Sequence, residues 1–308
     1  MPAEHPSGDS LGRIKFGEVI CRLPDAILYH AEYGPKRRPV LVRQYAPADR
    51  DNVIAALPAG GRYARAPWQN VLLIQQQRFA LTRKVFEELP NAPLAFVDEL
   101  LDETYYSVLA APAGASLKSG FGELRAPDER TLQQLILPIA SLLWGLHRQR
   151  VIYASLSPDE ILLDTATGAP GTPILAGFGS IYHLGGLGPP RPRPENRPNW
   201  APEFWDRQAA LAPTADIYAL GALCYQLMTG EPPNTAAERM RGLEHRPVHE
   251  AAPSYSAGLR RAVELSLSLD PARRPQSVQE FLNLAMANAK LEAPGPRARM
   301  RTAPAVPE

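Results

Sequence analysis

One segment of the sequence, DIYALGALCYQLMTG at positions 216–230, limits the possible folds more than any other. As a helix it would carry apolar residues on nearly every side, so it has no face suited to water and should be buried all round. Other elements must therefore surround it. The chain has 308 residues, 45% of them hydrophobic and 21% charged, which is enough for such a core in a soluble globular protein.

Charge and composition exclude some classes of partner. The formal net charge is +1, so no overall field favours nucleic acid or a membrane surface. The first residues lack the apolar core of a signal peptide, and no apolar stretch reaches the roughly eighteen residues of a membrane span. Cys21 and Cys224 lack metal-ligand spacing and are interpreted as reduced thiols, and His147 and the other histidines as surface or packing residues. We expect a cytoplasmic protein without a nucleic-acid partner.

The residue pattern changes along the chain from strand-like to helical. This order predicts an α+β protein with two lobes, a small β-rich N-lobe at 13–111 and a larger helical C-lobe at 117–288. In chain order, the strand-like runs are 25–33, 38–45, 94–100 and 104–112, and the helical runs are 68–89, 130–150, 216–230 and 255–291.

Both ends of the chain differ from this middle part. Residues 1–12 are expected to be a flexible N-terminus. Residues 289–308 are rich in proline and arginine and lack the apolar content to pack, so they should form a disordered tail or linker. A second proline-rich run, at 188–198, is expected to be a stiff surface loop.

Five short motifs follow one another in the second half of the chain. Each is a weak pattern alone, but together and in this order they resemble the motifs of eukaryotic-like protein kinases. The resemblance covers 13–288 and implies the two-lobed protein kinase fold. The motifs are VIYASLSPDEILLD at 151–164, ILAGFGS at 174–180, WAPEFW at 200–205, DIYALGALCYQLMTGEPP at 216–233 and SLDPARRP at 268–275.

The order of domain and tail carries a further resemblance. A kinase-like domain followed by a Pro/Arg-rich stretch resembles the cytoplasmic part of bacterial receptor-like kinases, where such a stretch leads to a membrane span. The resemblance implies a bacterial protein. A C-terminal continuation of the chain would then tether it to the inner face of the membrane.

The reactive groups of the kinase pattern are replaced in this sequence. The resemblance places the catalytic aspartate at Ser155, the catalytic-loop lysine at Ser157, the Mg²⁺-binding asparagine at Glu160, the D-F-G aspartate at Gly177 and the phosphate-pairing lysine at Arg43. A serine cannot act as the base near neutral pH, and a glycine has no side chain to coordinate Mg²⁺. We expect no catalysis and no metal site. Glu160 is interpreted as a solvated carboxylate, and Arg43 as a salt-bridged or snorkelling side chain that fills the cleft.

The nucleotide pocket is also altered. The segment in place of the glycine-rich loop, at 21–26, contains no glycine, although a backbone needs glycine to approach phosphates closely. A leucine replaces the alanine that covers the adenine. We therefore expect no ATP or other cofactor. The residues expected to occlude the pocket are Cys21, Leu23, Ala26, Leu41 and Leu162.

The structural residues of the kinase pattern are retained. The resemblance implies that Tyr153 and Phe178 stack in a column between the lobes, and that Asp216 holds the backbone of the catalytic loop. It also implies an internal ion pair between Glu203 and Arg274. The frame of a kinase is thus predicted without its reactive groups, which is a pseudokinase.

Two functions remain open. The first is a protein-binding scaffold or allosteric regulator in signalling, whose contact surface would be the helix at 68–89 with the basic segment 54–67 before it. The second is an atypical nucleotide-binding enzyme that uses Arg43 and Glu160 for residual phosphotransfer. The sequence favours the scaffold and does not identify its protein partner.

Overall fold

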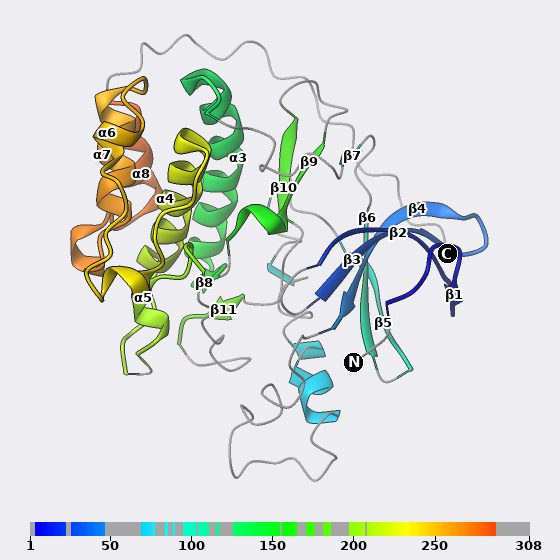
Figure 1. Ribbon diagram of the computed structural model, residues 1–308. Coiled ribbons are helices and arrows are strands. Elements are labelled where there is room, and N and C mark those ends of the chain that lie inside the picture. Colours follow the sequence, from blue (N-terminus) through cyan, green and yellow to red (C-terminus); the bar gives the residue numbers. More distant parts are fainter. Residues whose placement is uncertain are drawn as a thin grey trace.

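The structure is a computed structural model of the chain, and its ribbon separates into a β-rich part and a helical part (Figure 1). A six-stranded antiparallel sheet forms the N-terminal lobe, and the longer helices form the C-terminal lobe. This arrangement confirms the predicted α+β, two-lobed architecture. The structure describes residues 4–22, 26–46, 69–74, 76–77, 84–85, 89, 95–102, 104–110, 115–116, 126–154, 156–164, 171–175, 181–185, 197–206 and 208–287.

The N-terminal sheet has the strand order β1-β2-β3-β4-β6-β5. A tight turn joins β3 to β4, and there Gly34 adopts a φ of 73°, a left-handed conformation that glycine reaches without a steric penalty. The strands are β1 (Ser10–Leu11), β2 (Ile14–Arg22), β3 (Ala26–Tyr33), β4 (Arg38–Tyr45), β5 (Ala95–Leu101) and β6 (Thr104–Ala110).

Alternation along β4 decides which of its side chains face the other lobe. Val40 and Val42 join an apolar cluster on the outer face of the sheet, whereas Leu41 and Tyr45 join the cluster that continues into the helical lobe. Successive side chains of a strand point to opposite faces, so Arg43 lies on the inner face with Leu41 and Tyr45. The strand therefore presents an arginine to the cleft between the lobes.

The first described residues pack on the outer face of this sheet. The ring of His5 stacks on Phe16 with 4.0 Å between the ring centroids, and its Nε2 lies 2.8 Å from Tyr106 Oη. Beside it, β1 pairs with β2. The sequence predicted a flexible segment at 1–12, but residues 4–12 are held in place because ring stacking and strand pairing offset the entropy cost of ordering them.

The C-terminal lobe is built around helices with two small sheets at its edge. In Figure 1, β9 and β10 lie beside α3 on the side of the N-terminal lobe. The helices are α3 (Glu129–Arg148), α4 (Thr214–Thr229), α5 (Ala236–Arg239), α6 (Val248–Ala251), α7 (Ala257–Ser266) and α8 (Val278–Ala285). The short strands are β7 (Ala115–Ser116), β8 (Val151–Ile152), β9 (Ile161–Asp164), β10 (Thr172–Leu175) and β11 (Tyr182–His183), and the 3₁₀ turns are η2 (Pro158–Glu160), η4 (Pro202–Phe204) and η5 (Pro271–Arg273).

Helix α4 is buried on nearly all sides, as its sequence predicts. Gly230 ends the helix with a φ of 80° and donates its N–H to Gln226 O. Gly221 permits close packing on α7, because a Cβ at that position would lie 2.5 Å from Ser266 Cβ. The absence of a side chain at position 221 therefore sets the distance between the two helices.

Some predicted segments are described only in part. Residues 69–74, 76–77 and 84–85 of the predicted helix 68–89 are helical. Most of the predicted lobe boundary at 111–117 and all of the tail at 289–308 lie outside the described residues. Within the described part of the chain, no helix is both long and apolar enough to cross a membrane.

Candidate functional site

The backbone of the loop after β8 is fixed by Asp216, in the first turn of α4. Asp216 is fully buried, and its Oδ2 and Oδ1 accept hydrogen bonds from the backbone N–H groups of Tyr153 and Ala154, each at 2.8 Å. Ala154 has a φ of 67°, a strained conformation for a residue with a Cβ. The two hydrogen bonds stabilise this strained turn, so Asp216 acts on the loop in the way that the sequence predicted.

A histidine adds a third contact to the same carboxylate. His147, in the last turn of α3, places Nε2 2.8 Å from Asp216 Oδ2, and its side chain is 9% exposed. From the sequence, His147 was interpreted only as a surface or packing residue, with no specific partner. The available signal was its position, because a polar residue in the last buried turn of a helix that enters this loop needs a partner there.

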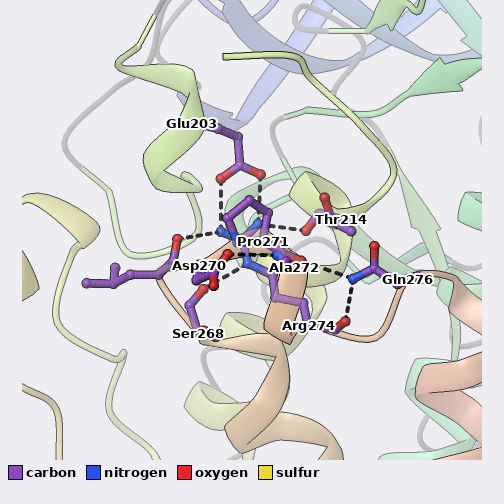
Figure 2. Close-up of polar contacts among 9 residues, drawn as sticks. Glu203, Thr214, Ser268, Asp270, Pro271, Ala272, Arg274 and Gln276 are labelled. Carbon is purple, nitrogen blue, oxygen red and sulfur yellow. Dashed lines mark hydrogen bonds and ion pairs between the residues drawn. The ribbon is translucent and has the colours of Figure 1, made fainter.

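Glu203 and Arg274 form a buried ion pair that connects three parts of the helical lobe (Figure 2). Arg274 Nη1 and Nη2 donate to the two oxygens of Glu203 at 2.7 and 2.9 Å. The same guanidinium donates from Nε to Ser268 O at 2.8 Å and from Nη1 to Thr214 O at 3.0 Å. The bidentate Arg274–Glu203 pair, with the two carbonyl contacts, links η4 to the start of α4 and to the turn before α8.

The apolar side of the cleft is covered by the protein's own side chains. Ala26, Leu41 and Leu162 are 0%, 1% and 4% exposed. Leu41 and Leu162 belong to one continuous apolar cluster that runs from the inner face of the sheet into the helical lobe. These predicted pocket residues are therefore all buried, while Leu23 lies outside the described residues.

The polar side of the cleft is a buried cluster of Arg43, Tyr153 and Glu160. Arg43 is 5% exposed and Glu160 is 6% exposed, and Tyr153 is fully buried. Burial raises the pKa of Tyr153 well above its ordinary value, the charge of Glu160 and a hydrogen bond to it raise it further, and Arg43 opposes them. Glu160 was expected to be a solvated carboxylate; it is buried instead, because a tyrosine hydroxyl and a nearby cation compensate its charge.

Strand β2 contacts the loop directly above this cluster. Cys21 Sγ donates to Asp159 O at 3.7 Å. Burial raises the pKa of the Cys21 thiol to about 11, the charges of Asp159 and Glu160 act in the same direction, and Arg43 lowers it. The end of β2 thus contacts η2. The charges of Asp159, Glu160 and Arg43 all influence the Cys21 thiol across the cleft.

The segment before η4 holds the loop from the other side. Arg197 Nη1 lies 3.0 Å from Asp159 Oδ2, and Asn199 Nδ2 donates to Leu156 O at 2.6 Å. Asp159 therefore accepts from β2 through its backbone and from Arg197 through its side chain. The loop is enclosed by contacts from both lobes.

Comparison with known proteins shows which proteins this chain resembles. No protein-family model matches the chain. The serine/threonine-protein kinase PknJ of Mycobacterium tuberculosis is 31% identical over 159 residues, which are 48% of this chain and 27% of PknJ. Serine/threonine-protein kinase C of Synechocystis is 26% identical over 227 residues, 69% of this chain and 41% of that protein. The chain therefore spans less than half the length of these bacterial relatives.

Solved structures decide the fold. The apo form of PpkA-294 superposes with a TM-score of 0.65 at 23% identity, over 92% of this chain and 99% of that one. The kinase domain of Mycobacterium tuberculosis PknI gives a TM-score of 0.62 at 18% identity, over 93% and 100%. The chain has a protein kinase fold. In protein kinases the nucleotide binds in the cleft between the two lobes.

Only some of the remaining kinase positions lie among the residues that the structure describes. Ser157 is 4% exposed and precedes η2 without a side-chain cap. Ser155, Gly177 and Phe178 lie outside the described residues, so the predicted column of Tyr153 and Phe178 stays a prediction. Among the described residues, no group of three or more His, Cys, Asp or Glu side chains is arranged to hold a metal ion.

Proposed function

We propose that this kinase fold is catalytically inactive, a pseudokinase, and that it serves as a protein-binding scaffold or allosteric regulator in signalling. One observation carries the proposal: the cleft residues Arg43, Tyr153 and Glu160 are buried and interact with one another in a packed interior. A nucleotide would have to replace contacts that the protein already makes. Because the protein's own side chains occupy the cleft, the proposal is that the protein acts through its surface and not through a bound nucleotide.

The chemistry of phosphoryl transfer supports the same proposal. A kinase transfers phosphate by positioning it and neutralising its charge with Mg²⁺ ions, a lysine and a catalytic aspartate. The sequence has serine at 155 and glycine at 177, where the kinase pattern has its base and its main Mg²⁺ ligand. Glu160 could in principle ligate a cation, but it interacts with Tyr153 in the buried cluster.

The contacts that hold the helical lobe in one arrangement are consistent with a scaffold. Asp216 fixes the loop after β8, and the pair Glu203–Arg274 ties η4 to the helical lobe. A rigid surface loses little entropy when it binds a partner. The predicted contact surface at 54–67 and 68–89 lies mostly outside the described residues and stays a prediction, as does a membrane tether through a C-terminal continuation.

A second function, nucleotide binding with residual phosphotransfer through Arg43 and Glu160, rests on two observations. The relatives PknJ and kinase C are named as serine/threonine-protein kinases. Arg43 also retains a cation on the inner face of β4, where the kinase pattern has its phosphate-pairing lysine. An arginine differs from a lysine in reach and shape but still attracts phosphate.

A thermal-shift measurement separates the two functions. The full chain is melted with and without millimolar ATP and Mg²⁺. A ligand at a hundredfold excess over its dissociation constant stabilises a fold by about 2.7 kcal/mol, which gives a measurable shift. We expect no shift for the scaffold. A Mg²⁺-dependent shift that disappears in Arg43→Ala, but not in the exposed control Arg38→Ala, would establish nucleotide binding instead.

A further inference from the structure

The outer face of α3 carries an exposed apolar stripe. Leu137 is 39% exposed and Trp144 is 46% exposed, although both are large hydrophobic side chains. They are seven positions apart in one helix, so they lie on the same face about 10 Å from each other. The exposed residues of this face, called the α3 stripe below, are Arg130, Gln134, Leu137, Ser141, Trp144 and Arg148.

The charges of α3 that face solvent are positive. Arg130 and Arg148 flank the two apolar side chains, and the Arg148 guanidinium lies 4.9 Å from the centroid of the Trp144 ring. The helix has a single acidic residue, Glu129, whose carboxylate accepts the Ser256 N–H at 2.6 Å. The stripe therefore combines apolar anchors with cations. The N-cap carboxylate of Asp128 lies near Arg130 and partly neutralises it, whereas α3 itself places no carboxylate beside Arg148.

We propose that the α3 stripe binds a helix of a partner protein, one with apolar residues at three- and four-residue spacing and acidic side chains beside them. The stripe alternates between these two spacings, as one half of a helix–helix seam does. Tryptophan and arginine are the residue types that most often dominate interface energies. Carboxylates on the partner would pair with Arg130 and Arg148.

This inference specifies the partner class of the scaffold proposed above and rests on that proposal for its biological role. The surface itself is separate from the cleft. The opposite face of α3 is buried, with Leu135, Leu143 and Leu146 each at 0% exposure. An acidic amphipathic helix could therefore dock on the stripe whatever the cleft binds.

Charge and burial disfavour other occupants. In a second copy of the chain, paired α3 helices would oppose Arg130 to Arg130 or to Arg148, and like charges in an interface repel. The arginine-rich tail at 289–308 would meet the same repulsion. A lipid surface would need the apolar face of the helix to enter the acyl region, but α3 is fixed in the lobe by its buried face.

The test uses the full chain and a designed peptide. The probe is a fluorescein-labelled helix of about twenty residues with leucine at the a and d positions and glutamate at e and g. Its control has lysine in place of glutamate. We expect saturable binding of the glutamate peptide in fluorescence anisotropy, weakened by salt, and weaker or absent binding of the lysine peptide.

Matched variants locate the binding site. Trp144→Ala should weaken binding by about tenfold or more, as expected for an interface tryptophan. Met240→Ala should leave binding unchanged, because Met240 is 56% exposed but lies outside the stripe. Combined Arg130→Glu and Arg148→Glu should reverse the preference toward the lysine peptide. All these side chains are exposed, so the melting temperatures should match that of the unaltered chain.

Several results would overturn the proposal. These are no binding, equal affinity for the two peptides, or equal effects of Trp144→Ala and Met240→Ala. Self-association in sedimentation that Trp144→Ala abolishes would make a second copy the occupant, and binding to phosphatidylserine vesicles that Trp144→Ala abolishes would make it lipid. The ATP melting experiment does not involve the α3 stripe, so failure of the inactive-cleft proposal and failure of this one remain distinguishable.

Discussion

Arg274→Ala should destabilise the fold more than any exposed substitution, because one guanidinium serves several buried acceptors. The side chains of Arg274 and Glu203 are 0% and 6% exposed. Truncation would leave Glu203 buried without its arginine and remove the donor to Thr214 O and Ser268 O. Breaking a buried pair costs about 3–5 kcal/mol, and we expect a loss of about 4 kcal/mol in the free energy of unfolding.

Urea denaturation and thermal melting measure this loss. For a chain of this size, 1 kcal/mol lowers the melting temperature by about 2 °C, so Arg274→Ala should melt about 8 °C lower. Arg273→Ala is a matched control, because Arg273 is the preceding residue but is exposed, and it should melt within about 1 °C of the unaltered chain. Arg274→Lys keeps the charge without the planar fork and should fall between them.

A double variant tests whether the buried charge is the cause. Combining Glu203→Gln with Arg274→Met removes both charges and should recover part of the loss of Arg274→Ala, because no unmatched carboxylate remains. If Arg274→Ala and Arg273→Ala melted alike, the pair would not stabilise the lobe. The match of Ala201-Pro202-Glu203, within WAPEFW, to the kinase pattern would then fail as well.

Four further predictions follow from the cleft and the core. Asp216→Asn removes one of the acceptors for the Tyr153 and Ala154 N–H groups and should cost about 2 kcal/mol in urea denaturation; an unchanged midpoint would contradict this. Gly221→Ala should cost about 1–3 kcal/mol through its contact with Ser266, and Ser266→Gly should relieve it; additive losses would refute the steric cause. Cys21 should react with iodoacetamide at pH 8 roughly a hundredfold more slowly than a free thiol, because its pKa is raised to about 11, and a rate near that of a free thiol would show that β2 does not rest on η2. Since the folded state holds this proton more tightly, the thiol's contribution to stability is present below its ordinary pKa and is lost as the pH rises through about 11. The combined variant Arg43→Lys, Ser155→Asp, Glu160→Asn and Gly177→Asp should still incorporate no radiolabelled phosphate from ATP with Mg²⁺ or Mn²⁺, because positioning supplies much of the rate and Leu41 still fills the pocket; incorporation above background would show an open pocket.

The fold and its frame could be predicted because their signals lie within single segments. The apolar residues at 216–230 require burial whatever the partners are, and α4 is buried. Glu203 and Arg274 each lie in a short motif, so the motif order was enough to pair them across the lobe. The resemblance placed Leu41 and Arg43 in the cleft, and alternation along β4 puts both on its inner face.

The sequence predicted an occluded pocket, but the particular contacts across the cleft could not be predicted in the same way, because they join distant segments. Cys21 and Asp159 are 138 positions apart, and their contact exists only because the end of β2 descends onto η2. No pattern in the sequence gives the separation of two lobes. The packing of His5 on Phe16 is similar, since a single histidine near a chain end has no periodicity that marks it as packed.

The burial of Glu160 shows why the replaced catalytic residues are best understood as a set. A lone carboxylate is costly in a packed interior, yet here the Tyr153 hydroxyl donates to it and the Arg43 charge lies nearby. Replacing Glu160 or Tyr153 by itself would remove one of these partners and leave the others buried without full compensation. The polar groups that a kinase directs at nucleotide and metal thus stabilise one another in this chain, and the contact of Cys21 with Asp159 joins the lobes above them. Under the inactive-cleft proposal, a nucleotide would bind more weakly because it would have to part Glu160 from Tyr153, and its binding energy would be reduced by the stability of that contact.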